Sequence, residues 1–344
     1  MGNKLEVTSE FIKQRQEILG IFASEVYGDI PPAPKKIEAI EKAIEGKNYF
    51  CGHARLLQVD LNCVLDDETD FSFSFKLCLP TNVYKNKIII LVNFTPNVPD
   101  KYCPAEEIID RGWAFASFDY QSITSDTNTP DGLASVYAPN GETGKLSLWA
   151  WGAMRIMDYL QTRDDIDIAN VGIVGHSRLG KTALWAAAND QRFRFIHSND
   201  SGTSGAALYR ERNDKSESIK DICERFPYWF NKTFPKYIDM ESKMVFDQDD
   251  LIKCIAPRIV SIGSASEDLW ANPKAEMLSA KNASIAWKGL GESGLENISD
   301  EAQIGVNYHD GKVGYYVREG RHCLSRNDWN RFLDFFDKNI CSLS

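Results

Sequence analysis

The chain has 344 residues, of which 43% are hydrophobic and 26% charged, a balance typical of a folded protein rather than a disordered one. Its formal net charge of -10 disfavours nucleic acid and anionic membranes as partners, because both require a basic face. No apolar run approaches the roughly 18 residues that a transmembrane helix needs.

The N-terminal segment predicts a helix that docks on the rest of the chain. Apolar side chains recur at helical spacing between positions 11 and 26, and no apolar leader with a cleavage site precedes them. The prolines of GDIPPAP (28–34) end this helix and start an extended segment. We expect residues 1–50 to form an extension of one domain that spans residues 1–344.

The next segments predict a sheet that begins antiparallel and continues parallel. Residues 54–80 alternate apolar and polar side chains, which is typical of a hairpin with one wet face. KIIILVNF (87–94) is continuously apolar and suits a strand buried on both faces. The other expected elements are a helix at 103–111, a strand at 112–120, a helix at 145–163, a strand at 170–175, a helix at 181–190, strands at 192–200, 257–265 and 313–320, and a helix at 327–340.

Strands that alternate with helices predict an α/β sandwich of three layers, and an antiparallel start is how α/β-hydrolases are built. Residues 205–250 fit no short crossover, so we expect them to form an insertion over the active-site edge of the sheet.

The stretch GHSRLGKT (175–182) matches two incompatible motifs. As G-x-x-x-x-G-K-[ST] it would cradle a nucleotide phosphate, with Lys181 on the phosphate and Thr182 on magnesium. As a sharp turn between the apolar VGIVG and the helix-forming TALWAAA, it would expose Ser177 as a nucleophile beside a helix N-terminus that stabilises an oxyanion. We favour the nucleophile, although the second glycine of the usual G-x-S-x-G is displaced to Gly180.

An activated serine needs a histidine that an acid orients, in the chain order serine, acid, histidine. His322 lies between the last expected strand and the last helix, where this base is expected, and His309 is a second candidate. Asp268 follows the penultimate buried strand, and Asp200 follows the strand after the nucleophile helix. Both carboxylates remain open as the acid.

The eight cysteines are scattered without a C-x-x-C pair, which disfavours a clustered zinc site. Their number permits disulfides without demonstrating any. We expect no metal and no cofactor.

Segments throughout the chain resemble the glucuronoyl esterases of carbohydrate esterase family fifteen, above all the bacterial branch. The form G-x-S-R-x-G-K is far more specific than G-x-S-x-G and explains the displaced glycine. The other matching segments are EVYGDIPP, RGWAFASFDY, LWAWGAMRIMDYL, SNDSGTSGAALYR, FPYWF, LIKCIAPR, SASEDLWANP and the region of His322 before DWNRFLDF.

The resemblance implies that Ser177 attacks the ester of a glucuronic acid on xylan, whose alcohol is lignin-like or another alcohol. It also implies that Arg178 adds a charged donor to the oxyanion hole, that Lys181 binds sugar hydroxyls, and that Trp270 lines the sugar site. Core packing is an equal alternative for Trp270. Tyr209 stands where fungal members carry a tryptophan.

Two departures from the fungal pattern bear on the acid and on the turn. Fungal members have a glutamate at the position of Asp200, and the shorter aspartate favours Asp268, the position that some bacterial members use. They also have a disulfide-bonded cysteine where this chain has His176. The segment 211–226 matches least and is expected to shape the far side of the sugar pocket.

The predicted function is therefore hydrolysis of (4-O-methyl-)glucuronate esters, in glucuronoxylan or in small molecules, by a monomer. Deacetylation of xylan or another sugar is the alternative, and the phosphate loop at 175–182 is a more distant one. The resemblance favours a secreted or periplasmic protein, whereas the sequence carries no export leader.

Overall fold

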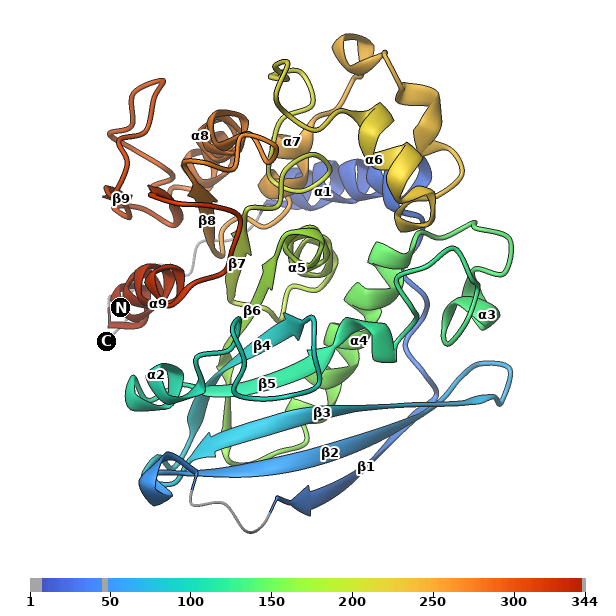
Figure 1. Cartoon of the computed structure of the whole chain (residues 1–344), viewed down its shortest axis with the longest axis vertical. Coiled ribbons are helices and arrows are strands. Elements are labelled where there is room, and N and C mark those ends of the chain that lie inside the picture. Colours follow the sequence, from blue (N-terminus) through green and yellow to red (C-terminus); the bar gives the residue numbers. More distant parts are fainter. Residues whose placement is uncertain (1–7, 45–48, 342–344) are drawn as a thin grey trace.

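The computed structural model describes residues 8–44 and 49–341, which form a ten-stranded sheet (Figure 1). The parts of the predicted N-terminal extension at 1–7 and 45–48 lie outside the described residues. The strand order is β1-β2-β3-β5-β4-β6-β7-β8-β10-β9. The strands are β1 (Lys36–Ala43), β2 (Ala54–Val64), β3 (Asp70–Pro80), β4 (Asn86–Asn93), β5 (Ala114–Asp119), β6 (Ile166–His176), β7 (Phe195–Asn199), β8 (Ile259–Ala265), β9 (Asn307–Tyr308) and β10 (Val313–Arg318).

The pairing confirms the predicted antiparallel start and parallel continuation. Strands β1, β2 and β3 pair antiparallel, and β3 pairs antiparallel with β5. From β5 to β10 every neighbouring pair is parallel, and only the short β9 at the far edge runs antiparallel again. Parallel strands present their carboxyl ends at one edge, so the loops after β4, β6, β7, β8 and β10 meet there.

Helices cover both faces of the sheet, as the predicted sandwich requires. In Figure 1, α2 and α9 lie on one side of the central strands, and α4 and α5 lie on the other. The helices are α1 (Ser9–Phe22), α2 (Ala105–Asp110), α3 (Ala134–Tyr137), α4 (Lys145–Leu160), α5 (Arg178–Asn189), α6 (Ile219–Arg225), α7 (Gln248–Lys253), α8 (Pro273–Gly289) and α9 (Arg326–Cys341).

The central strands feed two apolar cores because their side chains alternate between the faces. On β6, Ile173 packs into the core beneath α4, α5 and α8, whereas Val174 packs into the core beneath α2 and α9. Ile196 and Phe195 of β7 divide in the same way. Burial on both faces accounts for the continuous apolar runs in the sequence.

Outside the predicted insertion, four α-helices or strands were not among the elements predicted from the sequence: β1, α3, α8 and β9. Strand β1 is a sheet edge whose side chains are almost all exposed, so burial imposes no pattern on it. Helix α8 buries small residues together with Trp287, which dilutes its apolar periodicity. The other two are short, since α3 has four residues and β9 has two.

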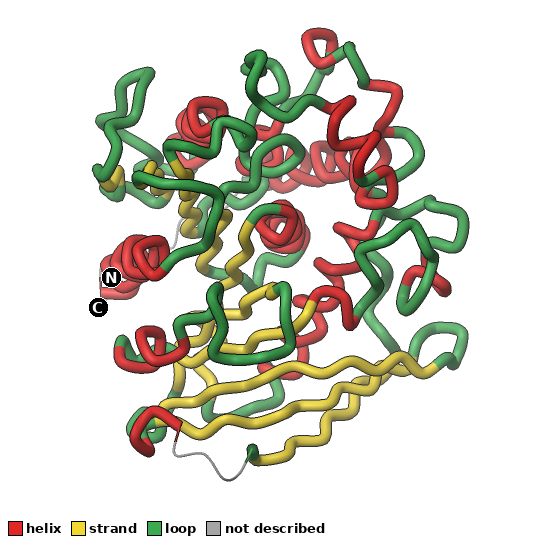
Figure 2. Tube along the Cα trace, viewed as in Figure 1, coloured by secondary structure: helices red, strands yellow, loops and turns green. Residues whose placement is uncertain are grey.

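The predicted insertion at 205–250 is short helices and loops (Figure 2). It includes α6 and the start of α7, and α7 packs on α8 and on the N-terminal helix α1. Of the eight cysteines, the seven with described side chains are free thiols. Within the described residues, no helix is both long and apolar enough to cross a bilayer.

Candidate active site

Ser177 occupies a sharp turn between β6 and α5. Its backbone lies at φ 58 and ψ -127, a conformation that is strained for a residue with a side chain. Its N–H donates to the carbonyl of Asn199 at 2.8 Å, which ties the turn to the end of β7. Such strain is common where a reactive group must be presented above a sheet.

Two glycines make this turn possible. A Cβ on Gly175 would lie 1.9 Å from the carbonyl oxygen of Leu179, so only glycine fits there. A Cβ on Gly180 would lie 2.9 Å from Ser198 Oγ and from Ser201 Cβ, where α5 approaches the loop after β7. The close approach therefore falls at Gly180, and Leu179 packs in the core instead. This accounts for the displaced second glycine of the motif.

His322 and Asp268 meet on neighbouring loops. Strands β8 and β10 are parallel and in register to their ends, so the loops that follow them leave the sheet together. The two loops are joined by a hydrogen bond from Glu267 N–H to the carbonyl of Gly320 at 2.9 Å. His322 Nδ1 lies 2.5 Å from Asp268 Oδ2. The Asp268 side chain is buried, whereas the His322 side chain is 45% exposed.

Asp200 approaches the same histidine without bonding to its ring. Ligand atoms of Asp200, Asp268 and His322 all lie within 4.8 Å of one another. Asp200 Oδ2 instead accepts the backbone N–H of Cys323 at 3.4 Å and lies 3.6 Å from a nitrogen of Arg318. Burial raises the pKa of Asp200 well above its usual range, and nearby carboxylates add to this. Its surroundings therefore disfavour the charged form.

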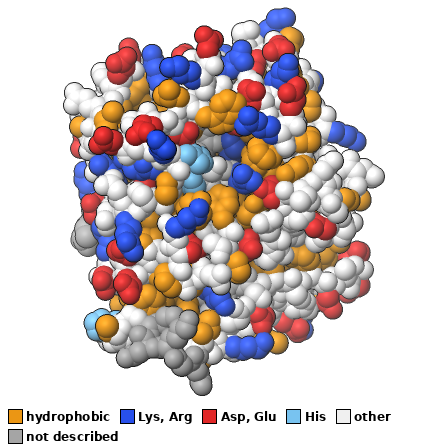
Figure 3. All heavy atoms as spheres, in the orientation of Figure 1, with side chains coloured by type: hydrophobic (Ala, Val, Ile, Leu, Met, Phe, Trp, Pro, Cys, Tyr) orange, Lys and Arg blue, Asp and Glu red, His pale blue; other side chains and the backbone are white. Residues whose placement is uncertain are grey.

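The imidazole of His322 lies against the residue before the serine. Its ring centroid is 4.4 Å from that of His176, and burial lowers the pKa of His176 well below its usual range. Among the described residues, the Ser177 hydroxyl makes no hydrogen bond. Figure 3 shows a hollow on this face, with histidine, basic and hydrophobic side chains around it.

Arg178, the first residue of α5, is held by an acidic and an aromatic side chain. Its guanidinium pairs with Asp126 and lies 4.7 Å from the ring centroid of Trp229. Asp126 also accepts hydrogen bonds from Trp229 Nε1 and from the Tyr120 hydroxyl, both at 2.7 Å. The positive charge next to the serine is therefore oriented by a carboxylate and an aromatic face.

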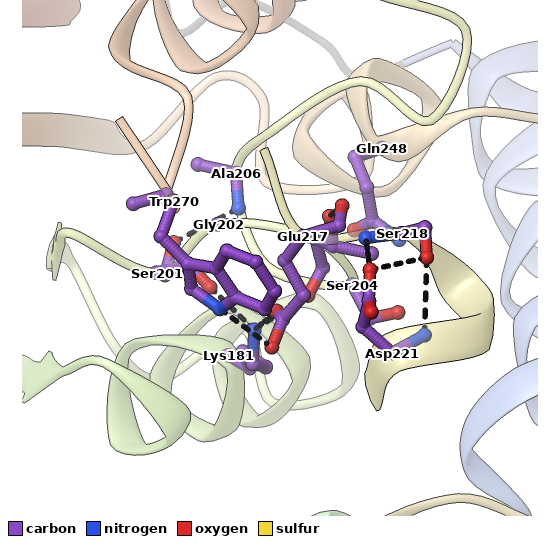
Figure 4. A network of polar contacts seen from close by, with 12 residues as sticks. Lys181, Ser201, Gly202, Ser204, Ala206, Glu217, Ser218, Asp221, Gln248 and Trp270 are labelled. Atoms are coloured by element: carbon purple, nitrogen blue, oxygen red, sulfur yellow. Dashed lines mark hydrogen bonds and ion pairs between the residues drawn. The ribbon is translucent and has the colours of Figure 1, made fainter. Parts of the chain in front are cut away.

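Lys181 lies in a polar network (Figure 4). Its ammonium donates to the carbonyls of Ser201 and Thr203 at 2.6 and 2.5 Å, and it lies 3.7 Å from Glu217 Oε2. Burial lowers the pKa of Lys181. Glu217 Oε1 accepts the indole N–H of Trp270 at 3.1 Å, and Trp270 is 39% exposed. Lys181 and Trp270, distant in sequence, thus meet through one carboxylate.

Glu217 was not among the residues singled out from the sequence. It lies in the insertion, where the sequence SES before a helix is typical of a capping motif, and Ser218 does cap α6.

Tyr209, which was singled out from the sequence as the counterpart of the fungal tryptophan, is buried, with 3% exposure. Its hydroxyl donates to Ser204 Oγ at 3.0 Å and accepts from Gln248 Nε2 at 2.7 Å.

The surroundings of Lys181 argue against the phosphate-loop interpretation. Two carbonyl oxygens and the Glu217 carboxylate take up its ammonium, so an incoming phosphate would meet acceptors and negative charge.

The acidic cluster at His322 is also poorly suited to a cation. Nδ1 of His322 is bound to Asp268, and the Arg318 guanidinium lies beside Asp200. In the described residues this cluster is the one group of three or more His, Cys, Asp or Glu side chains with ligand atoms close enough to share an ion.

A mostly parallel sheet with a serine on the strand-to-helix turn, and loops after the last parallel strands that carry aspartate and histidine, defines an α/β-hydrolase. The family model described as "Glucuronyl esterase, fungi" matches residues 63–291. The chain therefore belongs to the glucuronoyl esterase family, which confirms the resemblance found in the sequence.

Individual relatives agree with this membership. A carbohydrate esterase of an unknown prokaryotic organism is 38% identical over 243 residues, which cover 68% of this chain and 55% of that protein. A 4-O-methyl-glucuronoyl methylesterase of Hypocrea jecorina is 29% identical over 210 residues, which cover 58% of this chain and 45% of that protein. The solved glucuronoyl esterase from Solibacter usitatus superimposes with a TM-score of 0.85 at 32% identity, over 94% of this chain and 91% of that one. The chain spans about half the length of the curated relatives it matches.

Proposed function

We propose that this protein hydrolyses esters of glucuronic acid or 4-O-methyl-glucuronic acid, free or attached to xylan, through a covalent serine intermediate. Membership of the family and the name of the Hypocrea jecorina relative support the substrate class. The observation that carries the proposal is the pairing of His322 with Asp268 on the edge of the sheet where Ser177 is presented.

In the proposed reaction, Ser177 Oγ attacks the ester carbonyl carbon while His322 takes its proton. Asp268 accepts from Nδ1, holds the imidazole in one tautomer and stabilises its charged form. Collapse of the tetrahedral intermediate breaks the bond to the alcohol, which receives the proton from His322. Water activated by the same imidazole then releases the uronate and restores Ser177.

The oxyanion of the intermediate is assigned to donors at the start of α5. The N–H of Arg178 has no intrahelical acceptor at this position, as at the start of any helix. The guanidinium that Asp126 and Trp229 orient adds positive charge beside it. Loss of one such donor typically costs about 3–4 kcal/mol of transition-state stabilisation.

The sugar is assigned to the side of Ser177 that carries Trp270 and Glu217. An exposed indole offers a flat apolar face, and the Glu217 carboxylate has lone pairs beyond its bond to the indole. Lys181 acts here by holding Glu217 and the loop carbonyls, because its own ammonium is already engaged.

Ser177→Ala tests the proposal. We expect turnover of methyl and benzyl glucuronate to fall by at least about 10³-fold, because no nucleophile remains. Initial rates should be measured for both proteins, with a thermal melt to verify that the variant is folded. Wild-type turnover by Ser177→Ala would refute the mechanism.

Acetylated xylan assayed in parallel distinguishes the deacetylase alternative. If the wild-type protein releases acetate faster than it hydrolyses the uronate ester, the substrate is an acetylated sugar and the proposed mechanism still holds.

A further inference from the structure

Arg318 is the last residue of β10, four residues before His322, and its side chain is 7% exposed. Its Nε lies 2.9 and 2.8 Å from the two carboxylate oxygens of Asp328. Asp328 also accepts from the N–H of Ser325 at 2.7 Å and from its hydroxyl at 2.6 Å. The start of α9 thus fixes the plane of the guanidinium.

The other guanidinium nitrogens bind the loop that carries His322. One donates to the carbonyl of Glu319 at 3.2 Å. The other donates to the carbonyls of Arg321 and Cys323 at 3.0 and 2.5 Å. The residues on both sides of His322 are therefore held by one side chain.

Only arginine supplies this set of bonds. The loop has no helix or strand of its own and passes through Gly320 at φ +111, so local backbone bonds do not define its path. A guanidinium presents five N–H donors in one plane, whereas an ammonium presents three from a single point. A lysine at position 318 would keep the charge and lose this fork.

Asp200 completes the arrangement from the opposite side. Its Oδ2 accepts the N–H of Cys323 at 3.4 Å and lies 3.6 Å from the guanidinium of Arg318. The peptide groups of Cys323 are therefore held through both the N–H and the carbonyl. This gives the buried Asp200 a task other than bonding to the imidazole.

We propose that Arg318 is a positioning residue for catalysis: by binding the carbonyls on both sides of His322, it holds the imidazole in its bond with Asp268 and aims its other nitrogen at the serine turn. The inference rests on the proposed role of His322 as the base. A purely structural role for Arg318 would affect stability and leave the imidazole chemistry unchanged.

The test compares Arg318→Lys with Arg258→Lys on a glucuronate ester. Arg258 serves as the control, because its partly buried guanidinium also binds several backbone carbonyls, those of Ala187, Asp190, Phe193 and Ile255. We expect both variants to lower the melting temperature. Only Arg318→Lys should lower kcat, by about 10- to 100-fold, with KM within threefold.

Two further readouts separate positioning from stability. The acidic limb of the kcat/KM pH profile should change in Arg318→Lys and match the wild type in Arg258→Lys. A low-field proton signal that is lost in His322→Gln should also weaken in Arg318→Lys and persist in Arg258→Lys.

Unchanged kcat and an unchanged acidic limb in a folded Arg318→Lys would overturn the proposal. If that variant does not fold, Asp328→Asn decides, because it leaves the guanidinium in place and removes the carboxylate that orients it. A kcat loss of at least threefold and a shifted limb in Asp328→Asn support the proposal, and wild-type values refute it. Full activity of His322→Gln would instead show that the proposed function itself is wrong.

Discussion

Two carboxylates lie close to His322, and their bonds differ. Asp268 Oδ2 meets Nδ1 of the ring at 2.5 Å, whereas Asp200 binds backbone and faces Arg318. A carboxylate orients an imidazole only if it is charged and accepts the ring N–H. Burial raises the pKa of Asp200 well above its usual range, which weakens it for that task.

We therefore expect Asp268→Asn to reduce kcat by about 10²- to 10⁴-fold, because an amide donor at this point favours the wrong tautomer of His322. Asp200→Asn should reduce kcat by less than about tenfold, since an amide oxygen still accepts from Cys323. Steady-state rates on methyl glucuronate measure both. The reverse order of the two losses would assign the triad acid to Asp200.

The candidate triad residues singled out from the sequence share one property, which is a position shortly after a recognisable strand. Ser177, Asp268 and His322 could be named because chain order and the ends of apolar strands locate them. Glu217 and Arg318 could not. Glu217 lies in an irregular insertion. Arg318 acts through backbone carbonyls, and since every residue has one, the sequence does not indicate which of them Arg318 binds.

At the scale of elements, the turn from β6 to α5 depends on a close backbone contact. A Cβ at Gly175 would lie 1.9 Å from the carbonyl oxygen of Leu179 and 2.8 Å from the nitrogen of Gly180, and neither is a flexible side chain. The helix must therefore move if position 175 carries a methyl group.

Gly175→Ala should destabilise the fold by about 1–3 kcal/mol, the usual cost of overpacking, and should displace Ser177. Urea unfolding monitored by tryptophan fluorescence gives the change in stability. Gly20→Ala is the control, because Gly20 lies in α1 with no heavy atom within 4 Å of a Cβ. It should raise stability by about 0.5–1 kcal/mol, since alanine favours helix. Equal stability of Gly175→Ala and the wild type would contradict the steric account.

The elements that could be predicted are those that bury a regular stripe. Strands β4, β2 and β3 could be predicted because burial imposes a continuous or alternating pattern of apolar residues on them. Edge strand β1 is exposed, and α8 buries small side chains, so neither has a comparable pattern. The fold class could still be predicted because the parallel core strands carry it.

At the scale of the whole molecule, several buried groups make stability depend on pH. Burial lowers the pKa of His197 to about 3 and of His309 to about 4, and it holds that of His176 well below its usual range. Burial also raises the pKa of Glu276 to about 7. Glu276 accepts two backbone N–H groups from the loop after β7, at 2.8 and 2.9 Å, so its titration bears on the site.

Below about pH 6.5 the unfolded chain protonates its histidines, while the three buried rings stay neutral, so unfolding takes up protons and stability falls as the pH falls. Glu276 acts in the opposite sense between about pH 4.5 and 7, because the folded state keeps a proton that the unfolded state releases. These four groups together give a net uptake of about two protons, or roughly 3 kcal/mol per pH unit near pH 5.5, and the raised pKa of Asp200 reduces this uptake in the same sense as Glu276. Guanidinium unfolding at pH 5, 6 and 7 measures this slope.

Glu276→Gln should make the slope of stability against pH steeper by about one proton, because the opposing group is gone and the amide oxygen still accepts the two N–H groups. An unchanged slope in this variant would show that Glu276 is ionised in the folded protein.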